Sequence, residues 1–253
     1  MTDLEFALAL ADAADDISMR HFRSRTLVVH TKPDLTPVSD ADHAVEDALR
    51  ARIVAERRGD AVLGEEGGAI GSGSVRWIVD PIDGTRNFVR GIPVFATLIA
   101  LERDGELVVG VVSAPALHRR WWAARGEGAY FNGEPIHVSG VTRIEDAVVG
   151  YTSARSFFEK GVGDRFVALA ERSWMARGVG DFWQHMLVAE GAVDLAVELG
   201  VSIWDLAAVQ VVVEEAAGRF TDAAGIRRAD GGSVITSNGH LHAEALRAFE
   251  PLV

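Results

Sequence analysis

Apolar positions in the first sixty residues recur at helical spacing and are interrupted once by an extended segment. Residues 3–23 carry apolar side chains three and four positions apart, which predicts an amphipathic helix. The following stretch, LVVHTKPDLTPVS, contains two prolines and therefore cannot continue that helix. Ser39 is the expected N-cap of a second helix over residues 40–58, which ends at Gly59.

Shorter apolar runs, bounded by turn residues, then predict strands. AVLG at 61–64 and the run at 76–80 are the first two, separated by the loop sequence GEEGGAIGSGS. Within residues 94–131, FATLIALERDGELVVGVVSAP predicts two strands joined by Asp104-Gly105, which is a strong hairpin signal. RRWWAA and GAYFNG continue the strand pattern.

The second half of the chain alternates between strand and helix patterns. The expected strands are 147–151, 176–179, 193–198, 219–221 and 233–236, and the expected helices are 163–173, 182–190, 203–217 and 239–249. Strands and helices mixed in this way predict a layered α+β architecture with helices packed on sheets. The chain has no repeat or long linker, so we expect one unit with lobes of about 1–140 and 141–253.

The composition is that of a globular enzyme with a strong negative charge. Of 253 residues, 48% are hydrophobic and 25% are charged, and 37 acidic against 25 basic residues give a net charge of −12. Such a surface repels phosphate backbones, so we expect no nucleic-acid partner. The absence of cysteine excludes disulfides, a thiol nucleophile and a zinc–thiolate site.

Neither the N-terminus nor any apolar run predicts a membrane role. MTDLEFALALADAADD is acidic and amphipathic, whereas a secretory signal starts with basic residues followed by an apolar run. The longest uninterrupted apolar runs, such as LVVGVV, are too short to cross a bilayer. We therefore expect a cytoplasmic, soluble protein with no membrane partner.

The first candidate chemistry lies in WIVDPIDGTRNF, residues 77–88, where an apolar strand ends in two carboxylates. Asp80 and Asp83 converge if the chain bends at Pro81, and the Ile82 carbonyl then points the same way. Carboxylates and a backbone carbonyl are ligands that Mg²⁺ prefers. The same residues are equally consistent with an ordinary turn, because Asp, Pro and Gly favour turns for local backbone reasons.

Other acids lie near the ends of separate elements, and each has an ordinary alternative explanation. Glu65 and Glu66 follow the strand at 61–64, where loop charges are normally solvated. Asp205 follows Ser202 at the spacing of a capping box. Two further acids, Asp40 and Asp42, lie in the first turn of the second expected helix, where the helix dipole favours them.

Taken together, these stretches resemble the inositol monophosphatase superfamily. WIVDPIDGTRNF matches the signature W-x-x-D-P-x-D-G-T-x-N-F, and the upstream G-E-E stands at 64–66. The downstream W-D-x-A-A and E-A-x-G stand at 204–208 and 215–218, in the same order and at similar spacing. Ala217, where members often carry glycine, is a departure. The resemblance implies an αβαβα sugar-phosphatase fold over residues 1–253.

The resemblance also implies a phosphoric monoester hydrolase with two or three Mg²⁺ ions in each active site. Glu65, Asp80 and the Ile82 carbonyl would hold the first ion. A second would lie between Asp80, Asp83 and Asp205, and Glu65 would help to hold a third. The implied reaction is in-line displacement at phosphorus by an activated water, without a phosphoenzyme.

Further roles follow from the same resemblance. Thr85, paired with Asp40, would orient and deprotonate the attacking water, with Glu65 as a further catalytic residue. The backbone N–H groups of Gly84 and Thr85 would contact the phosphate, since both lead into a short helix whose free N–H groups favour anions. Asp205 would also contact the substrate.

The flanking sequence narrows the substrate. GTRNFVRGIPVFATLIAL and the run GVGDFWQHMLVAEGAVDLAVELGVSIWDLAA look most like the actinobacterial type of histidinol-phosphate phosphatase, an enzyme of histidine biosynthesis. Asp181 stands where similar inositol-type enzymes carry a small or hydroxylic residue, and Glu198 stands at a leaving-group position. Two carboxylates suit the ammonium group of histidinol phosphate. Asp181 is also a candidate N-cap for the helix at 182–190.

Several alternatives stay open. A second hypothesis keeps the chemistry and changes the substrate to inositol 1-phosphate or a related sugar phosphate. A third, from another class, is a regulatory binding protein, as some relatives in the superfamily are, although the intact set of acids argues against a purely non-catalytic protein. A homodimer through the apolar hairpin region 94–124 is expected. Lys32 is either near the site or solvated, and His185 is either a packing residue or faces the substrate.

Two histidines and two tryptophans stand out in the sequence but are expected to have structural rather than catalytic roles. His240 and His242 are two positions apart, unlike a helical zinc pair, and are expected at the surface. Trp121 and Trp122 lie in an expected strand and should point to opposite faces.

Overall fold

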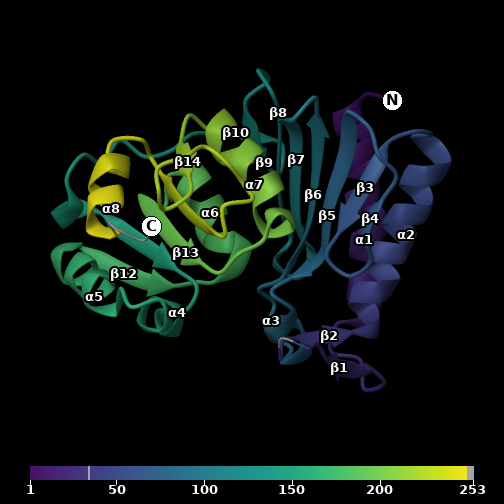
Figure 1. The fold of residues 1–253 in the computed structure, drawn as a ribbon, viewed down its shortest axis with the longest axis horizontal. Helices are drawn as coiled ribbons and strands as arrows, with labels where there is room; N and C mark the ends of the chain where they lie inside the picture. The colour runs from purple at the N-terminus through teal and green to yellow at the C-terminus, as the bar shows by residue number, and fades with distance from the viewer. Residues whose placement is uncertain (34, 250–253) are drawn as a thin grey trace.

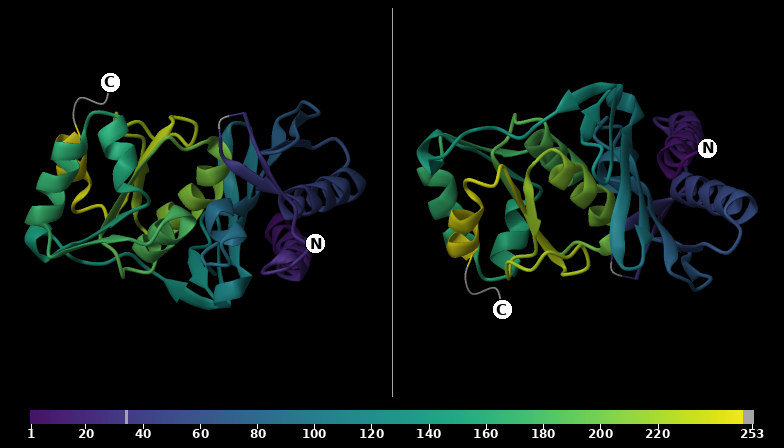
Figure 2. Two further views of the ribbon diagram at one scale, coloured as in Figure 1. Left: turned by 90° about the horizontal axis from the view of Figure 1, so that it is seen from below. Right: turned by 90° about the horizontal axis from the view of Figure 1, so that it is seen from above.

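The computed structural model describes residues 1–33 and 35–249 and stacks helices and sheets in five layers (Figure 1). α1 and α2 cover one face of a large sheet, α6 and α7 fill the space between this sheet and a smaller one, and three further helices close the far side. The helices are α1 (Asp3–His21), α2 (Asp40–Glu56), α3 (Thr85–Val89), α4 (Ala154–Glu159), α5 (Gly163–Arg172), α6 (Asp181–Ala189), α7 (Ile203–Glu215) and α8 (His242–Phe249). The same layering is visible from below and from above in Figure 2.

The large sheet runs in the order β10-β9-β8-β7-β6-β5-β3-β4 within the described residues. Its strands are β3 (Ala61–Gly64), β4 (Gly68–Ile70), β5 (Val75–Asp83), β6 (Ala96–Arg103), β7 (Glu106–Ala114), β8 (Arg119–Ala124), β9 (Ala129–Phe131) and β10 (Glu134–Ile136). β6 and β7 are mostly apolar and buried because helices cover both of their faces. Asp104 and Gly105 both adopt positive φ in the turn between them, so the expected hairpin is confirmed.

The smaller sheet runs in the order β12-β11-β13-β15-β14 within the described residues. Its strands are β11 (Val148–Tyr151), β12 (Met175–Gly178), β13 (Leu195–Leu199), β14 (Arg219–Thr221) and β15 (Ser233–Ser237). β11 is parallel to both β12 and β13, so the ends of β11 and β13 open on the same edge. Thr152 and Glu198 lie at that edge, which is where ligands bind in many open sheets.

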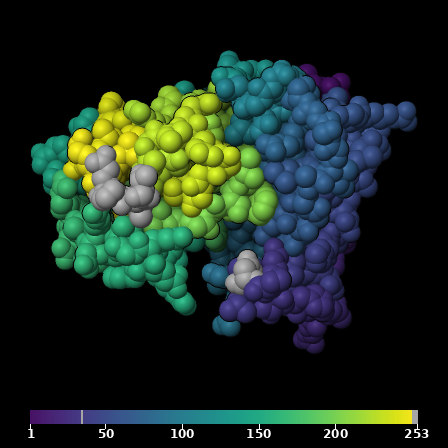
Figure 3. All heavy atoms as spheres, viewed as in Figure 1, coloured from purple at the N-terminus to yellow at the C-terminus, as the bar shows by residue number. Residues whose placement is uncertain are grey.

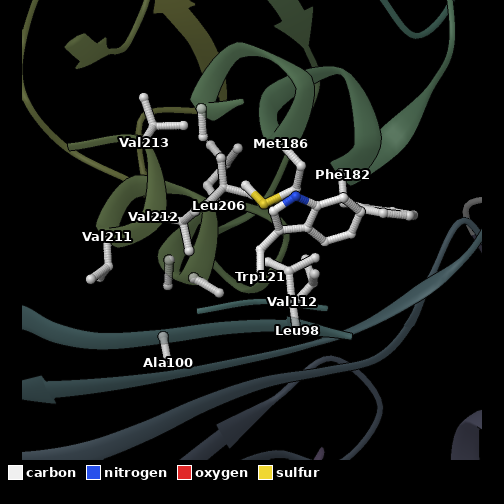
Figure 4. Packing of buried hydrophobic residues seen from close by; sticks show 14 of the residues in the cluster. Leu98, Ala100, Val112, Trp121, Phe182, Met186, Leu206, Val211, Val212 and Val213 are labelled. Carbon is white, nitrogen blue, oxygen red and sulfur yellow. The ribbon is translucent and has the colours of Figure 1, made fainter. Parts of the chain in front are cut away.

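The middle helical layer is packed tightly against the large sheet. Trp121 points from β8 toward Phe182 and Met186 of α6 and toward Leu206 of α7 (Figure 4). Gly110 of β7 is required by the same packing, because a Cβ there would lie 2.5 Å from the Ala208 carbonyl oxygen of α7. The rigid contact fixes α6 and α7 relative to β5, on which the candidate carboxylates lie.

The layered α+β class expected from the sequence is confirmed, and most element boundaries agree within a few residues. Trp122 packs on the α1 side while Trp121 packs on the α7 side, so the prediction of opposite faces is also confirmed. Several short elements were missed. The extended segment contains a small antiparallel ribbon, β1 (Val29–Thr31) with β2 (Pro37–Ser39), and α4 follows β11. The stretch GEEGGAIGSGS, predicted to be a loop, contains β4, which pairs with β3, and β10 pairs with β9.

The surface position expected for His242 is wrong. Its side chain is fully buried, with Nε2 2.9 Å from Thr221 Oγ1 and Nδ1 2.9 Å from Ser237 Oγ. Two hydroxyl groups thus satisfy both ring nitrogens, which is the condition for burying a polar ring. Within the described residues, none of the helices combines the length and apolarity that a bilayer crossing requires.

Candidate active site

The carboxyl end of β5 bends where the sequence places Asp80 and Asp83. The pairing of β5 with β6 shifts register between these two residues, as in a β-bulge. Asp80 Oδ1 accepts a hydrogen bond from the Ile82 N–H at 3.0 Å, and the Pro81 carbonyl accepts one from Thr97 Oγ1 at 2.8 Å. The turn interpretation and the clustering of acids are therefore both correct, because the turn is what brings the carboxylates together.

Asp80, Asp83 and Asp205 form a compact acidic group. One oxygen from each lies within 4.8 Å of the others, which is close enough to share a metal ion. Burial, followed by neighbouring carboxylates, raises the pKa of Asp80 and Asp83 well above their usual range. Burial raises the pKa of Asp205 to about 6, although its hydrogen bond from the Ser202 N–H acts in the opposite direction. A bound divalent cation would remove this repulsion, so the donor set fits a hard metal.

Asp205 serves two purposes at the start of α7. Its Oδ2 accepts the Ser202 N–H at 2.6 Å, so the expected capping box is present. Its carboxyl group also contacts that of Asp80. The cap fixes the rotamer that carries the second oxygen into the acidic group.

Glu65 lies next to the acidic group, bound to a lysine. Lys32 Nζ lies 2.7 Å from Glu65 Oε1 and 2.6 Å from Glu66 Oε1, and the first of these glutamates is near enough to raise the pKa of Asp80. Burial lowers the pKa of Lys32, but its hydrogen bonds to the two glutamates raise it overall. Lys32, whose place the sequence left open, is therefore part of the site.

A buried ion pair on α2 supports the loop that carries Glu65, and sequence reasoning missed it. Glu46 Oε1 lies 2.7 Å from Arg50 Nε, and both side chains are at least nine-tenths buried. Glu46 accepts the N–H groups of Glu66 and Gly67 at 2.8 and 2.7 Å. Gly64 is required there, because a Cβ would lie 2.5 Å from Glu46 Cδ. The available signal was an acid and a base four residues apart on the apolar side of a helix.

The pairing of Thr85 with Asp40 is wrong, because Thr85 pairs with Asp42. Thr85 Oγ1 lies 3.1 Å from Asp42 Oδ1 and 3.0 Å from the Ile82 carbonyl oxygen. Asp42 is fully buried, whereas the Asp40 side chain is about half exposed and 3.9 Å from His30 Nε2. Asp42 is the N3 residue of α2 and folds back to cap Ser39 at 2.8 Å, which turns it inward.

Gly84 allows the chain to pass close to the opposite wall. Its φ of +82° favours glycine, and a Cβ would lie 2.9 Å from the Val94 carbonyl oxygen and 3.2 Å from Asp181 Oδ2. Thr85 follows it as the first residue of α3.

Asp181 forms the opposite wall, at the first position of α6. Its Oδ2 accepts a hydrogen bond from Asn87 Nδ2 at 2.8 Å. The N-cap alternative for Asp181 is wrong, because Asp83 Oδ2 accepts the Phe182 N–H at 2.7 Å and so caps this helix. Burial, then the Glu198 and Asp205 carboxylates, raise the pKa of Asp181 to about 7, while Arg86 acts in the opposite direction.

Two adjoining cavities lie between these walls. The first, about 420 Å³, is lined by the Lys32–Glu65 pair, Thr85 and Asp205. The second, about 530 Å³, is lined by Glu198, Thr152 and residues of α4, and the two share Arg86, Asp181 and Gly200 in their linings. Figure 3 shows the surface hollowed between the α4 segment and the β1–β2 ribbon. A ligand can therefore place one end beside the acidic group and the other beside Glu198.

A layered fold with a buried acidic group beside a polar cavity is shared with known phosphatases. The profile of the inositol monophosphatase family matches residues 2–253, and the chain belongs to this family. The histidinol-phosphatase of Mycobacterium tuberculosis is 52% identical over 250 residues, covering 96% of each chain. That of Streptomyces coelicolor is 47% identical over 255 residues, covering 97% of this chain and 96% of its own.

Solved structures of inositol monophosphatases have the same fold as this chain. The IMPase of Thermotoga maritima has a TM-score of 0.90 at 32% identity and covers 100% of this chain and 98% of its own. An inositol monophosphatase from Zymomonas mobilis has a TM-score of 0.87 at 35% identity, covering 98% and 97%. The chain is thus a phosphoric monoester hydrolase with the inositol monophosphatase fold, and its acidic group can hold a metal ion.

Proposed function

We propose that this chain is a Mg²⁺-dependent histidinol-phosphatase that converts L-histidinol phosphate and water to L-histidinol and phosphate in histidine biosynthesis. The observation that carries the proposal is the pair of carboxylates, Asp181 and Glu198, on the cavity that adjoins the acidic group. The two histidinol-phosphatases that are 52% and 47% identical over nearly the whole chain support it.

The metal would be held by the residues that the signature supplies. Glu65, Asp80 and the Ile82 carbonyl are the ligands proposed for one ion, and Asp80, Asp83 and Asp205 for a second. Glu65 would also contribute to a third. Bound Mg²⁺ would lower the pKa of a nearby water and offset charge on the leaving oxygen.

Thr85 and Asp42 would handle the proton of the attacking water. Because the Thr85 hydroxyl can donate to Asp42 Oδ1, its oxygen keeps a lone pair that accepts a proton from a water. As the water oxygen bonds to phosphorus, its proton passes to Thr85, and the hydroxyl proton passes to Asp42. The bond from phosphorus to the ester oxygen breaks on the opposite side, and the leaving oxygen takes a proton from solvent.

The phosphate and the amine would occupy opposite ends of the joined cavities. The backbone N–H groups of Gly84 and Thr85 are the proposed phosphate contacts, with Asp205 near the ester oxygen. Asp181 and Glu198 would bind the substrate ammonium group, since carboxylates accept charge-assisted hydrogen bonds. A neutral polyol gains less from two carboxylates, which argues against inositol 1-phosphate as the preferred substrate.

The assembly and location are also proposals. We infer a cytoplasmic homodimer. α1 and α7 cover β6 and β7, so most of the expected hairpin interface is buried within one chain. The α1-side face of β8, where Trp122 is partly buried, remains for a partner copy. Light scattering on the purified protein would test the dimer.

The decisive experiment compares phosphate release from histidinol phosphate and from inositol 1-phosphate, with Mg²⁺ and with a chelator. We expect histidinol phosphate to be preferred and the chelator to abolish both activities. A tenfold higher kcat/KM for inositol 1-phosphate, about 1.4 kcal/mol of transition-state discrimination, would reject the proposed substrate.

A further inference from the structure

Two buried donors converge on one oxygen of Glu198. Gln184 Nε2 lies 3.0 Å and His185 Nε2 lies 3.2 Å from Glu198 Oε2. Both donors come from α6, whereas Glu198 comes from the end of β13. The contact therefore joins the middle helical layer to the edge of the smaller sheet, at the wall of the second cavity.

Other elements hold these donors in place. His185 is 1% exposed, and its Nδ1 lies 2.8 Å from Thr236 Oγ1 on β15. Gln184 is fully buried, and its Nε2 also donates to Thr152 Oγ1 at 2.8 Å. An ionised carboxylate only accepts hydrogen bonds, so the proton between His185 and Glu198 belongs to the histidine Nε2.

The orientation of the Gln184 amide leaves one group without a partner. Its Oε1 is buried and has no hydrogen-bond partner among the described residues, which is unfavourable for a buried polar atom. Turning the amide over would place this oxygen against Glu198 Oε2, which can only accept hydrogen bonds, and it would remove a donor from the carboxylate. The amide is thus held as a donor toward Glu198 even though its other atom is left unpaired.

The bonding pattern leaves the other oxygen of Glu198 available to a ligand. Both donors engage Oε2, and Glu198 lines the same cavity as Asp181. On the other side of the cavity, Asn87 holds Asp181 at 2.8 Å. The two carboxylates are therefore anchored separately, each by hydrogen-bond donors from its own side of the cavity.

We propose that His185 and Gln184 are positioning residues that hold the Glu198 carboxylate turned toward the substrate amine, and so set the preference for a cationic leaving group. This inference rests on the proposed function and deepens it. Without the two donors, the Glu198 side chain would be free to rotate away from the amine, because these hydrogen bonds are what hold its Oε2 in place. The amine would then lose one of its two anionic partners, and substrate binding would weaken more than the chemical step.

The test is a double-mutant cycle between His185 and Glu198. Steady-state kinetics of His185→Leu, Glu198→Gln and the double variant are measured with histidinol phosphate and with p-nitrophenyl phosphate. We expect His185→Leu to lower the kcat/KM ratio of the first ester to the second about tenfold, mainly through KM. In the Glu198→Gln background, His185→Leu should alter the ratio less than twofold. The reason is that His185 acts through the Glu198 carboxylate, which this background has already replaced by an amide.

Matched variants separate positioning from folding. His185→Gln keeps an N–H donor near the position of Nε2 and should restore the ratio to within about threefold of the unmodified enzyme. Gln184→Leu should behave like His185→Leu. His242→Leu removes another fully buried histidine, which lines neither cavity, and should change the melting temperature but not the ratio.

Two results would overturn the inference. One is an equal loss on both esters in His185→Leu, and the other is a loss of the same size when Glu198 is already Gln. If His185→Leu does not fold, Gln184→Leu takes its place in the same cycle with Glu198→Gln. Failure of the proposed substrate is recognised separately, because the unmodified enzyme would then prefer inositol 1-phosphate before any variant is compared.

Discussion

At the scale of single residues, the account depends on which acid serves Thr85. Asp42→Asn should lower kcat about 10²–10⁴-fold, because the amide cannot take the proton that Thr85 passes on. Asp40→Asn, two positions away, is the matched control and should stay within twofold, since that side chain faces solvent. Phosphate release under saturating Mg²⁺ would measure both. Comparable losses in the two variants would remove Asp42 from its proposed role.

Asp181 has a backbone conformation that is unusual for a residue other than glycine. Its φ of +49° is rare outside glycine, although Asp and Asn tolerate it better than other residues. Asp181→Asn therefore removes the charge without adding strain and should lower kcat/KM for histidinol phosphate about tenfold or more. Its melting temperature should hardly change, because Asn can keep the contact with Asn87 through its side-chain oxygen. An equal loss on p-nitrophenyl phosphate would make Asp181 structural rather than selective.

His242 predicts a pH dependence of stability. Burial, and then Arg219, lower its pKa to about 4 from the ordinary value of 6.5. The imidazole of His242 therefore binds a proton more readily in the unfolded chain than in the folded chain. The contribution of the neutral, buried imidazole to the free energy of unfolding is complete above pH 6.5 and is lost as pH falls toward 4. Its size is at most about 3 kcal/mol. Urea unfolding at several pH values should show this slope in the unmodified chain and lose much of it in His242→Gln, whereas an unchanged slope would assign it to other groups.

At the scale of elements, α2 connects the outer layer to the site. Glu46→Gln leaves the Arg50 charge buried without its partner, so the free energy of unfolding should fall by about 3–5 kcal/mol. The loop after β3, which carries the proposed ligand Glu65, should also loosen. Mg²⁺ binding, measured by calorimetry, should then weaken. Glu46→Gln combined with Arg50→Met removes both charges and should recover part of the stability. If Mg²⁺ affinity is unaffected in a folded Glu46→Gln variant, the loop does not depend on this pair.

Element patterns explain what the sequence could and could not predict. β5 and the paired acids were predictable, since an apolar run followed by Asp-Pro-Ile-Asp-Gly has few structural interpretations. The β1–β2 ribbon and α4 were not, because each strand has three residues and α4 has six, too short for periodicity. Asp42 was distinguishable from Asp40 only through the capping-box spacing from Ser39, which orients the side chain inward.

At the scale of the whole molecule, the site lies where elements from distant parts of the chain meet. The acids come from the end of β5, the start of α7 and the loop after β3, and the second cavity adds α4, α6 and β13. Sequence order says little about such contacts, so the pairing of His185 with Glu198 and the hydrogen bonds from the loop after β3 to Glu46 could not be predicted. Burial of these side chains depends on the five layers closing together.

The central claim is that the grouped carboxylates bind a divalent cation. The most direct measurement is an anomalous difference map from a crystal of the unmodified protein grown with Mn²⁺ in place of Mg²⁺. The account predicts a peak in contact with oxygens of Asp80, Asp83 and Asp205. A map with no peak between these three side chains, from a protein that Mn²⁺ activates, would contradict it.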